Sequence, residues 1–145
     1  LGTRIFYVSL GGFDTHSQQE GVHAALLGEL SSALSAFCKD MEDHKLRERI
    51  LVATYSEFGR RVQENGSLGT DHGTASQMFL VTPEGHKKSK AGLIGKHPSL
   101  TDLDKEGDMK FHTDFRSVYT SLLENWVEFP SEKVLGGNFK KLDFV

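Results

Sequence analysis

Apolar residues along the chain follow two periodicities, which predict strands in some segments and helices in others. Residues 4–10 and 50–55 are short runs rich in β-branched and aromatic side chains, and residues 78–82 form a third. Runs of this length and composition predict strands. The run at 50–55 is apolar without alternation, as expected for a parallel strand covered on both faces. Glycine and proline are expected to end the first and third runs, at Gly11, Gly12, Pro83 and Gly85.

Helical spacing replaces this pattern in two segments. Over residues 17–43, apolar side chains recur every three or four positions and predict one buried helix face: Leu27, Leu30, Leu34, Phe37 and Met41. A second helix is predicted after Thr113 or Asp114, either of which suits the N-cap, and Pro130 is expected to close it. Its predicted buried face consists of Phe115, Val118, Tyr119, Leu122, Leu123 and Trp126.

The order of these elements predicts an α/β fold. A strand, an amphipathic helix and a second strand form a right-handed βαβ unit by default. At 145 residues the chain is the size of one domain, so a single domain over residues 1–145 is expected. The segment 84–110 is longer than loops without secondary structure normally are, so a hairpin or an excursion that covers part of the protein is expected there. The tail from residue 134 is expected to pack back on the body. The absence of a preamble before residue 4 suggests a fragment of a longer protein.

Composition excludes several classes of protein. The chain is 37% hydrophobic and 26% charged, with a formal net charge of −3, so no basic surface for nucleic acid is expected. One cysteine, Cys38, excludes an internal disulfide and is expected to be a small core residue. No continuous apolar run approaches the roughly 18 residues of a membrane helix, so no membrane span is expected.

Candidate chemistry gathers where regular elements end. The stretch YSEFGRRVQENGSLGTDHG at residues 55–73 places Glu57 and Arg60 just after a predicted strand and an Asp-His pair between two glycines. Four groups of polar residues share such boundaries: Asp14 with His16, Glu57 with Arg60, Asp71 with His72, and His112 with Asp114. In an α/β sheet, ligands bind at the carboxyl edge of the strands. Carboxylate and imidazole donors suit zinc or manganese, and magnesium or calcium if carboxylates dominate.

Each group also has a purely structural interpretation. An Asp-His pair between glycines is compatible with a turn in which the Asp bonds its own backbone. Asp14 and Asp114 could each cap a helix, and Glu57 could simply pair with Arg60. The other histidines, His23, His44, His86 and His97, lack such a context.

The motifs together resemble a known family. GGFDTH at residues 11–16, SEFGRR at 56–61, NGS at 65–67 with GTDHG at 69–73, and HTDFR at 112–116 resemble, in this order, the carboxyl-terminal half of the domain of unknown function 1501 family. That family is similar to the alkaline phosphatase and sulfatase superfamily. The resemblance covers nearly the whole chain.

The resemblance implies a three-layer α/β/α fold with a mainly parallel sheet and a metal site at its carboxyl edge. By motif, the metal ligands fall on Asp14, His16 and His112, and on either Glu57 or the pair Asp71 and His72. The nucleophile belongs to the amino-terminal half, so this chain alone is expected to be inactive.

The function implied is hydrolysis of a phosphate or sulfate ester by an exported bacterial enzyme with one or two divalent metals. Glu57 is expected to act as a ligand or base, and Arg60 as a clamp on the substrate anion. A twin-arginine leader and a periplasmic or exported location follow from the resemblance alone. The alternatives are a non-catalytic binding or surface-assembly module with a degenerate site, and a metal-dependent mutase.

Overall fold

The computed structural model describes residues 2–82 and 90–145, which form two compact units. The helix–hairpin unit contains the described residues of 7–83 together with 99–110. The carboxyl-terminal unit contains those of 1–6 and 84–98 together with 111–145. Each unit is described by itself, and the single domain predicted from the sequence stays a prediction.

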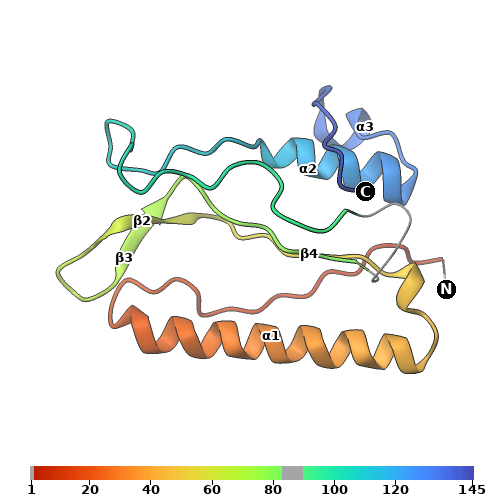
Figure 1. Ribbon diagram of the computed structural model, residues 1–145, viewed down its shortest axis with the longest axis horizontal. Coiled ribbons are helices and arrows are strands. Elements are labelled where there is room, and N and C mark those ends of the chain that lie inside the picture. Colours follow the sequence, from red (N-terminus) through yellow and green to blue (C-terminus); the bar gives the residue numbers. More distant parts are fainter. Residues whose placement is uncertain (1, 83–89) are drawn as a thin grey trace. The chain divides into compact units, whose positions relative to one another are not determined.

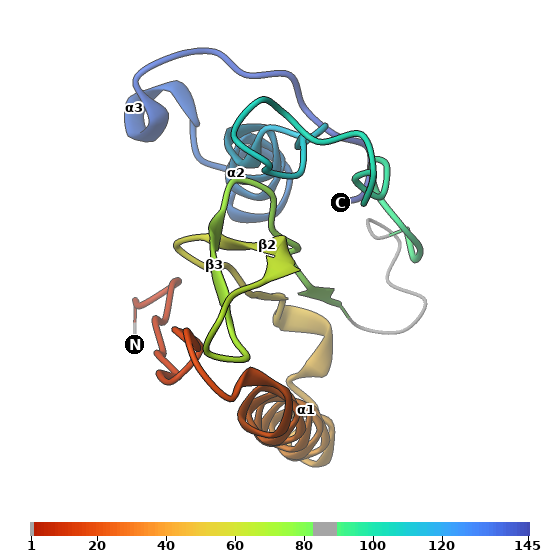
Figure 2. The ribbon, with the colours of Figure 1, turned by 90° about the vertical axis from the view of Figure 1, so that its left-hand side faces the viewer.

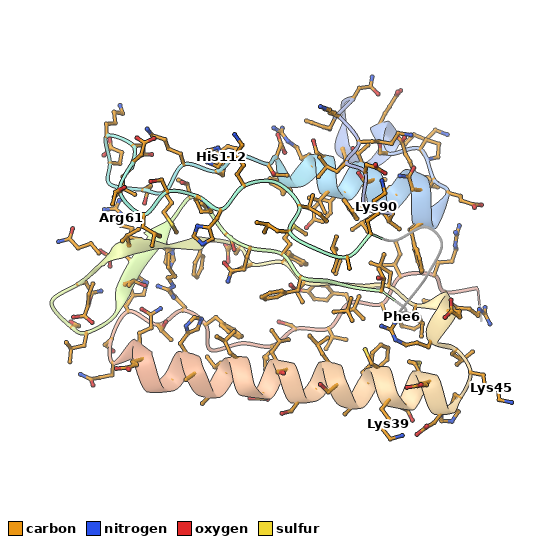
Figure 3. All side chains as sticks on the ribbon, viewed as in Figure 1. Phe6, Lys39, Lys45, Arg61, Lys90 and His112 are labelled. Carbon is orange, nitrogen blue, oxygen red and sulfur yellow. The ribbon has the colours of Figure 1, made fainter. Side chains whose placement is uncertain are left out.

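A 25-residue helix, α1 (Gln19–Asp43), confirms the helical spacing of the first half (Figure 1). None of its residues is fully buried, and its half-buried stripe is Leu26, Leu30, Leu34, Cys38 and Met41. Leu27 and Phe37, predicted on the buried face, are 40% and 41% exposed. Lys39 and Lys45 lie near its carboxyl end (Figure 3).

α1 is also long and apolar enough to cross a membrane, with a mean hydropathy of 1.2 over its best 18-residue window. The core helix of a soluble protein and a signal sequence near the amino terminus both meet the same two criteria. The half-buried stripe along one side of α1 is what such an amphipathic helix shows. The absence of a membrane span stays a prediction.

The predicted strand at residues 4–10 is not formed, and its prediction as buried is wrong. Ile5, Phe6, Tyr7 and Val8 are 67–89% exposed, and the backbone here has no ladder partner among the described residues. A strand exists only when a neighbour supplies its hydrogen bonds, so β-propensity alone is not sufficient. Gly12, in the turn predicted to follow this run, adopts a φ of 95°, which glycine permits at no steric cost.

The second and third predicted strands pair with each other over two residues each. β1 (Val52–Ala53) and β4 (Leu80–Val81) are antiparallel, with Val52 opposite Val81 and Ala53 opposite Leu80. The predicted βαβ unit is not formed by the described residues, and the mainly parallel three-layer sheet stays a prediction. Three residues of the sequence prediction lie outside the described part: Pro83, Gly85 and His86.

The glycine-flanked stretch after residue 57 is predicted as a loop, but the structure forms a hairpin here. β2 (Gly59–Glu64) pairs antiparallel with β3 (Thr70–Gly73), with Gly59 opposite Gly73. Asn65 builds the turn, because its Oδ1 accepts hydrogen bonds from the backbone N–H groups of Ser67 and Gly69 at 3.0 and 3.1 Å. An Asn-Gly step between two runs is a recognised hairpin signal, which the loop prediction overlooked.

A small turn from the predicted excursion completes the helix–hairpin unit. Leu103 and Met109 form an antiparallel bridge, and Asp104 caps the turn between them by accepting from the backbone N–H groups of Glu106 and Asp108. Asp108 is buried and pairs with Arg61 of β2, with Nε to Oδ1 at 3.2 Å. Among the described residues of the predicted hairpin or covering excursion, this isolated bridge is the pairing that the structure shows. Arg61 of β2 is labelled in Figure 3.

The carboxyl-terminal unit confirms the second predicted helix. α2 (Phe115–Ser121) runs directly into a π-helical segment, η2 (Leu122–Val127), and a short α3 (Glu132–Leu135) follows. The tail packs back as predicted: the backbone N–H of Leu142 donates to Ser121 Oγ at 2.8 Å, and Phe144 is buried. Phe115, predicted on the buried face, is 58% exposed.

Removing the N-cap of α2 is expected to destabilise the protein by about 1 kcal/mol. Asp114 accepts from the backbone N–H of Arg116 at 2.8 Å, and an Asp114→Ala variant loses this bond. The Arg116 side chain holds the pKa of Asp114 below its ordinary value. A depressed pKa stabilises the fold above the unfolded-state pKa, and the effect is lost as pH falls through the folded-state pKa. Urea denaturation of both proteins should therefore show a difference at pH 7 that narrows below about pH 4.

Candidate metal centre

The segment joining residue 13 to α1 is bonded to the hairpin along its length (Figure 2). The backbone N–H groups of Gln18 and Gln19 donate to the carbonyls of Ser67 and Leu68 at 3.0 and 2.8 Å. These donors open α1, whose first N–H groups have no partner within the helix, so the hairpin turn acts as its cap. The N–H of Thr70 also donates to Thr15 O at 3.4 Å. Residues 13–19 and the hairpin are thereby held together.

Gly69 makes this close approach possible. A Cβ at Gly69 would lie 2.2 Å from the carbonyl carbon of His16 and 2.5 Å from the backbone nitrogen of Ser17. Atoms of a folded protein do not approach so closely, and no backbone atom could move aside without moving the whole segment. The glycine therefore allows the His16 backbone to lie directly against the hairpin.

This packing brings together three residues that are far apart in sequence. Nε2 of His72 lies 2.8 Å from Asp14 Oδ1, Nε2 of His16 lies 3.0 Å from the same oxygen, and the two Nε2 atoms are 3.1 Å apart. The three atoms form one triangle, here called the donor triangle. The side chains are between 46% and 61% exposed, so the triangle is open to solvent.

The electrostatics of the site keep its carboxylates ionised. A hydrogen bond from His72 lowers the pKa of Asp14 below its ordinary value, and the charges of His16, His72 and Arg60 lower it further. A hydrogen bond from Asn65 and then one from His16 lower the pKa of Asp71 in the same way. Both groups are therefore carboxylates at neutral pH, which is the form that binds a cation.

Asp71 and Asn65 lie behind the donor triangle. Asp71 Oδ1 is 3.4 Å from Nδ1 of His16, the ring nitrogen that does not belong to the triangle. Nδ2 of Asn65 donates to Asp71 Oδ1 at 3.3 Å and to the carbonyl of His16 at 3.0 Å. Asp71 is predicted as a metal ligand, but in the structure its carboxylate contacts the candidate ligand His16 and is not part of the triangle.

Phe58 and Arg60 support the other side of the triangle. The Phe58 ring stacks on the His72 imidazole, with centroids 3.6 Å apart and an interplanar angle of 10°. Arg60 donates to Asp14 Oδ1 at 3.3 Å, to Thr70 O at 2.6 Å and to the carbonyl of Phe13. Most of the guanidinium donors are therefore used within the protein, and they hold Asp14 in place.

The other two predicted site residues are not part of the triangle. Glu57 is exposed at the bend before β2, and it has no hydrogen bond or ion pair among the described residues. His112 is exposed just before α2, in the carboxyl-terminal unit (Figure 3). Their roles stay predictions. No role is predicted for Asn65 or Phe58 from the sequence. The signals that point to them are the Asn-Gly step and an aromatic residue two positions from Arg60.

The donor triangle fits a divalent metal. It offers two imidazole nitrogens and one carboxylate oxygen, a set found in catalytic zinc sites with an open fourth position. Ligand atoms around a tetrahedral zinc with bonds of about 2.0–2.1 Å lie about 3.3 Å apart. The separations of 2.8 to 3.1 Å in the triangle are close to this value, so a slight spreading of the side chains would suffice.

The hairpin and the segment before α1 together supply a His₂Asp donor set, which defines a candidate metal-binding protein. The family model described as Protein of unknown function (DUF1501) matches residues 1–133. The chain belongs to this family, as its motifs predict. No curated protein and no solved structure matches the chain.

Proposed function

We propose that this chain carries a metal site of a phosphate or sulfate ester hydrolase of the alkaline phosphatase and sulfatase type. The proposal depends on one observation, the donor triangle of Asp14, His16 and His72, whose ligand atoms all lie within 4.8 Å of one another. In this proposal the chain is the carboxyl-terminal half of a larger α/β domain. The amino-terminal half would supply the nucleophile, and export is inferred from the same resemblance.

In this proposal each residue of the site has a separate role. Asp14, His16 and His72 would bind zinc or manganese. His112 lies in the other unit, and its role as a ligand stays a prediction. A bound divalent metal activates a nucleophile and stabilises the charge on a leaving oxygen. Glu57, exposed beside the hairpin, is free to act as a base. Arg60 would mainly fix Asp14, since a clamp on the substrate anion would compete with its bonds to Phe13 and Thr70.

The exposure of the triangle is the observation that favours the alternative, a non-catalytic binding module. Enzymes accelerate ester hydrolysis more effectively in a site shielded from bulk solvent, because charges interact more strongly there. Three donor side chains that are 46% to 61% exposed would bind a metal without that advantage unless another part of the protein covers them.

The test uses the complete protein, including any residues that precede this chain. We expect one or two zinc or manganese ions per molecule by elemental analysis. We also expect hydrolysis of p-nitrophenyl phosphate or p-nitrophenyl sulfate that a chelator abolishes and added metal restores. Bound metal without hydrolysis of either ester would favour the binding module. A protein that takes up neither metal would contradict the proposal.

A further inference from the structure

Asp71 and His72 are neighbours on β3, and strand geometry separates their roles. Successive side chains of a strand point to opposite faces, so an adjacent pair does not readily direct both groups at one point. His72 is the residue of the pair that belongs to the donor triangle. Asp71 instead reaches Nδ1 of His16, at 3.4 Å, on the side of the ring away from Asp14.

We infer that Asp71 is a positioning residue, which fixes the tautomer of His16 so that its Nε2 is free to bind the metal. A carboxylate accepts but does not donate, so Nδ1 of His16 carries the proton when it faces Asp71. Asp14 lies 3.0 Å from Nε2 of the same ring, but its Oδ1 accepts from the closer Nε2 of His72, at 2.8 Å. The other nitrogen of a neutral imidazole is then an unprotonated acceptor. This inference deepens the proposed function and depends on it for the identity of the ligand. It gives Asp71 a different role from the metal ligand that the sequence predicts.

Asn65 holds the carboxylate of Asp71, and its hydrogen bonds to the hairpin turn determine the orientation of its own side-chain amide. Its Oδ1 accepts from two backbone N–H groups, those of Ser67 and Gly69, so this atom is the oxygen of the amide. Its Nδ2 must then face Asp71 and the carbonyl of His16. Asn65, Asp71 and His16 thus form a chain of hydrogen bonds from the hairpin turn to the donor triangle.

When His16 carries its proton on Nδ1 and both histidine rings are neutral, the three atoms of the triangle share one proton, which is on Nε2 of His72. Nε2 of His72 donates to Asp14 Oδ1 at 2.8 Å and lies 3.1 Å from Nε2 of His16. Two acceptors, Asp14 and His16, therefore face one donor. To bind a divalent cation through Nε2, a neutral His72 would have to carry its proton on Nδ1 instead, and the cation would then meet three acceptor atoms. The opposite tautomer of His16 would place a further proton among these atoms.

The first test needs no metal. Long-range ¹H–¹⁵N correlation spectra of the metal-free protein report which nitrogen of each histidine ring is protonated. We expect His16 to carry its proton on Nδ1 in the native protein and to show a mixture of tautomers in an Asp71→Ala variant. An Asp43→Ala variant, which removes an exposed carboxylate of α1, should leave the spectrum of His16 unchanged. A native His16 with its proton on Nε2 would overturn the inference.

The second test uses cobalt(II) as the probe and separates a positioning residue from a ligand. Asp71→Ala is expected to weaken cobalt binding about 10–100-fold, the usual effect of losing the partner of a ligating histidine. The visible absorption spectrum of the bound cobalt should not change, because the ligand set is the same. Asp71→Asn keeps an acceptor oxygen and should restore part of the affinity. A spectrum that changes in Asp71→Ala would identify Asp71 as a ligand and overturn the inference.

Failure of the inference and failure of the proposed function can be distinguished. A native protein that binds no cobalt would contradict the metal site, while the tautomer of His16 in the metal-free protein would still judge the role of Asp71. Cobalt binding with the same affinity in Asp71→Ala would leave the metal site in place and overturn the inference alone.

Discussion

Replacing His72 by alanine is expected to lower the affinity of the protein for zinc or manganese by more than about 100-fold. Loss of a residue that merely supports a ligand already costs about 10–100-fold, and His72 supplies one of three donor atoms. The variant leaves only Asp14 and His16, whose ligand atoms lie 3.0 Å apart, to bind the metal. Titration with each metal, followed by calorimetry, measures the effect.

A matched control is available for this variant. His44 is an exposed histidine at the end of α1, where its Nδ1 lies 2.9 Å from the carbonyl oxygen of Asp40 and 3.5 Å from the carboxylate of the same residue. His44→Ala removes the same side chain and should leave metal affinity within about twofold, since surface changes away from a site have small effects. Equal affinities of His72→Ala and the native protein would mean that the donor triangle binds no metal.

Gly59→Ala is expected to destabilise the protein by about 3 kcal/mol or more, which is at the upper end for overpacking. Gly59 is buried at the start of β2, and a Cβ there would lie 1.8 Å from the carbonyl oxygen of Ala75. The obstacle is backbone, so no side chain can rotate away and the two strands must separate. Urea denaturation measures the loss of stability, and metal titration should show weaker binding because His72 lies on the displaced strand.

Gly66→Ala is the control for this substitution. Gly66 lies in the hairpin turn, and a Cβ there would meet no atom within 4 Å. The free energy of unfolding should change by less than about 0.5 kcal/mol. Similar losses of stability in both variants would show that the cost comes from replacing any glycine of the hairpin, and the close contact of Gly59 with Ala75 would not be its cause.

The helices could be predicted because their information is local. Leucines spaced by three and four residues define α1, and Asp114 followed by an apolar stripe defines α2. Both signals lie within one segment of the chain, and a helix satisfies its own backbone hydrogen bonds. Tertiary contacts decide only which positions of the predicted face are covered, which is why Leu30 and Leu34 are half-buried while Phe37 is exposed.

The strands were less predictable because their partners lie elsewhere in the chain. Residues 4–10 have the composition of a strand, yet no described segment pairs with them. Residues 59–73 are predicted as a loop, because their charged and polar side chains show no alternation of apolar and polar positions. The structure forms a hairpin there, since Asn65 supplies the turn and Gly59 and Gly73 allow the strands to approach.

By itself, the sequence determined the family, the two long helical segments and the residue types of a candidate metal site, because each follows from a pattern of residues that are close together in the chain. Only the tertiary structure decided which of those residues meet. Asp14, His16 and His72 converge because Gly69 lets residues 13–19 lie against the hairpin, while Asp71 is directed to the far side of the His16 ring. Proximity between distant segments depends on backbone contacts that no local pattern encodes.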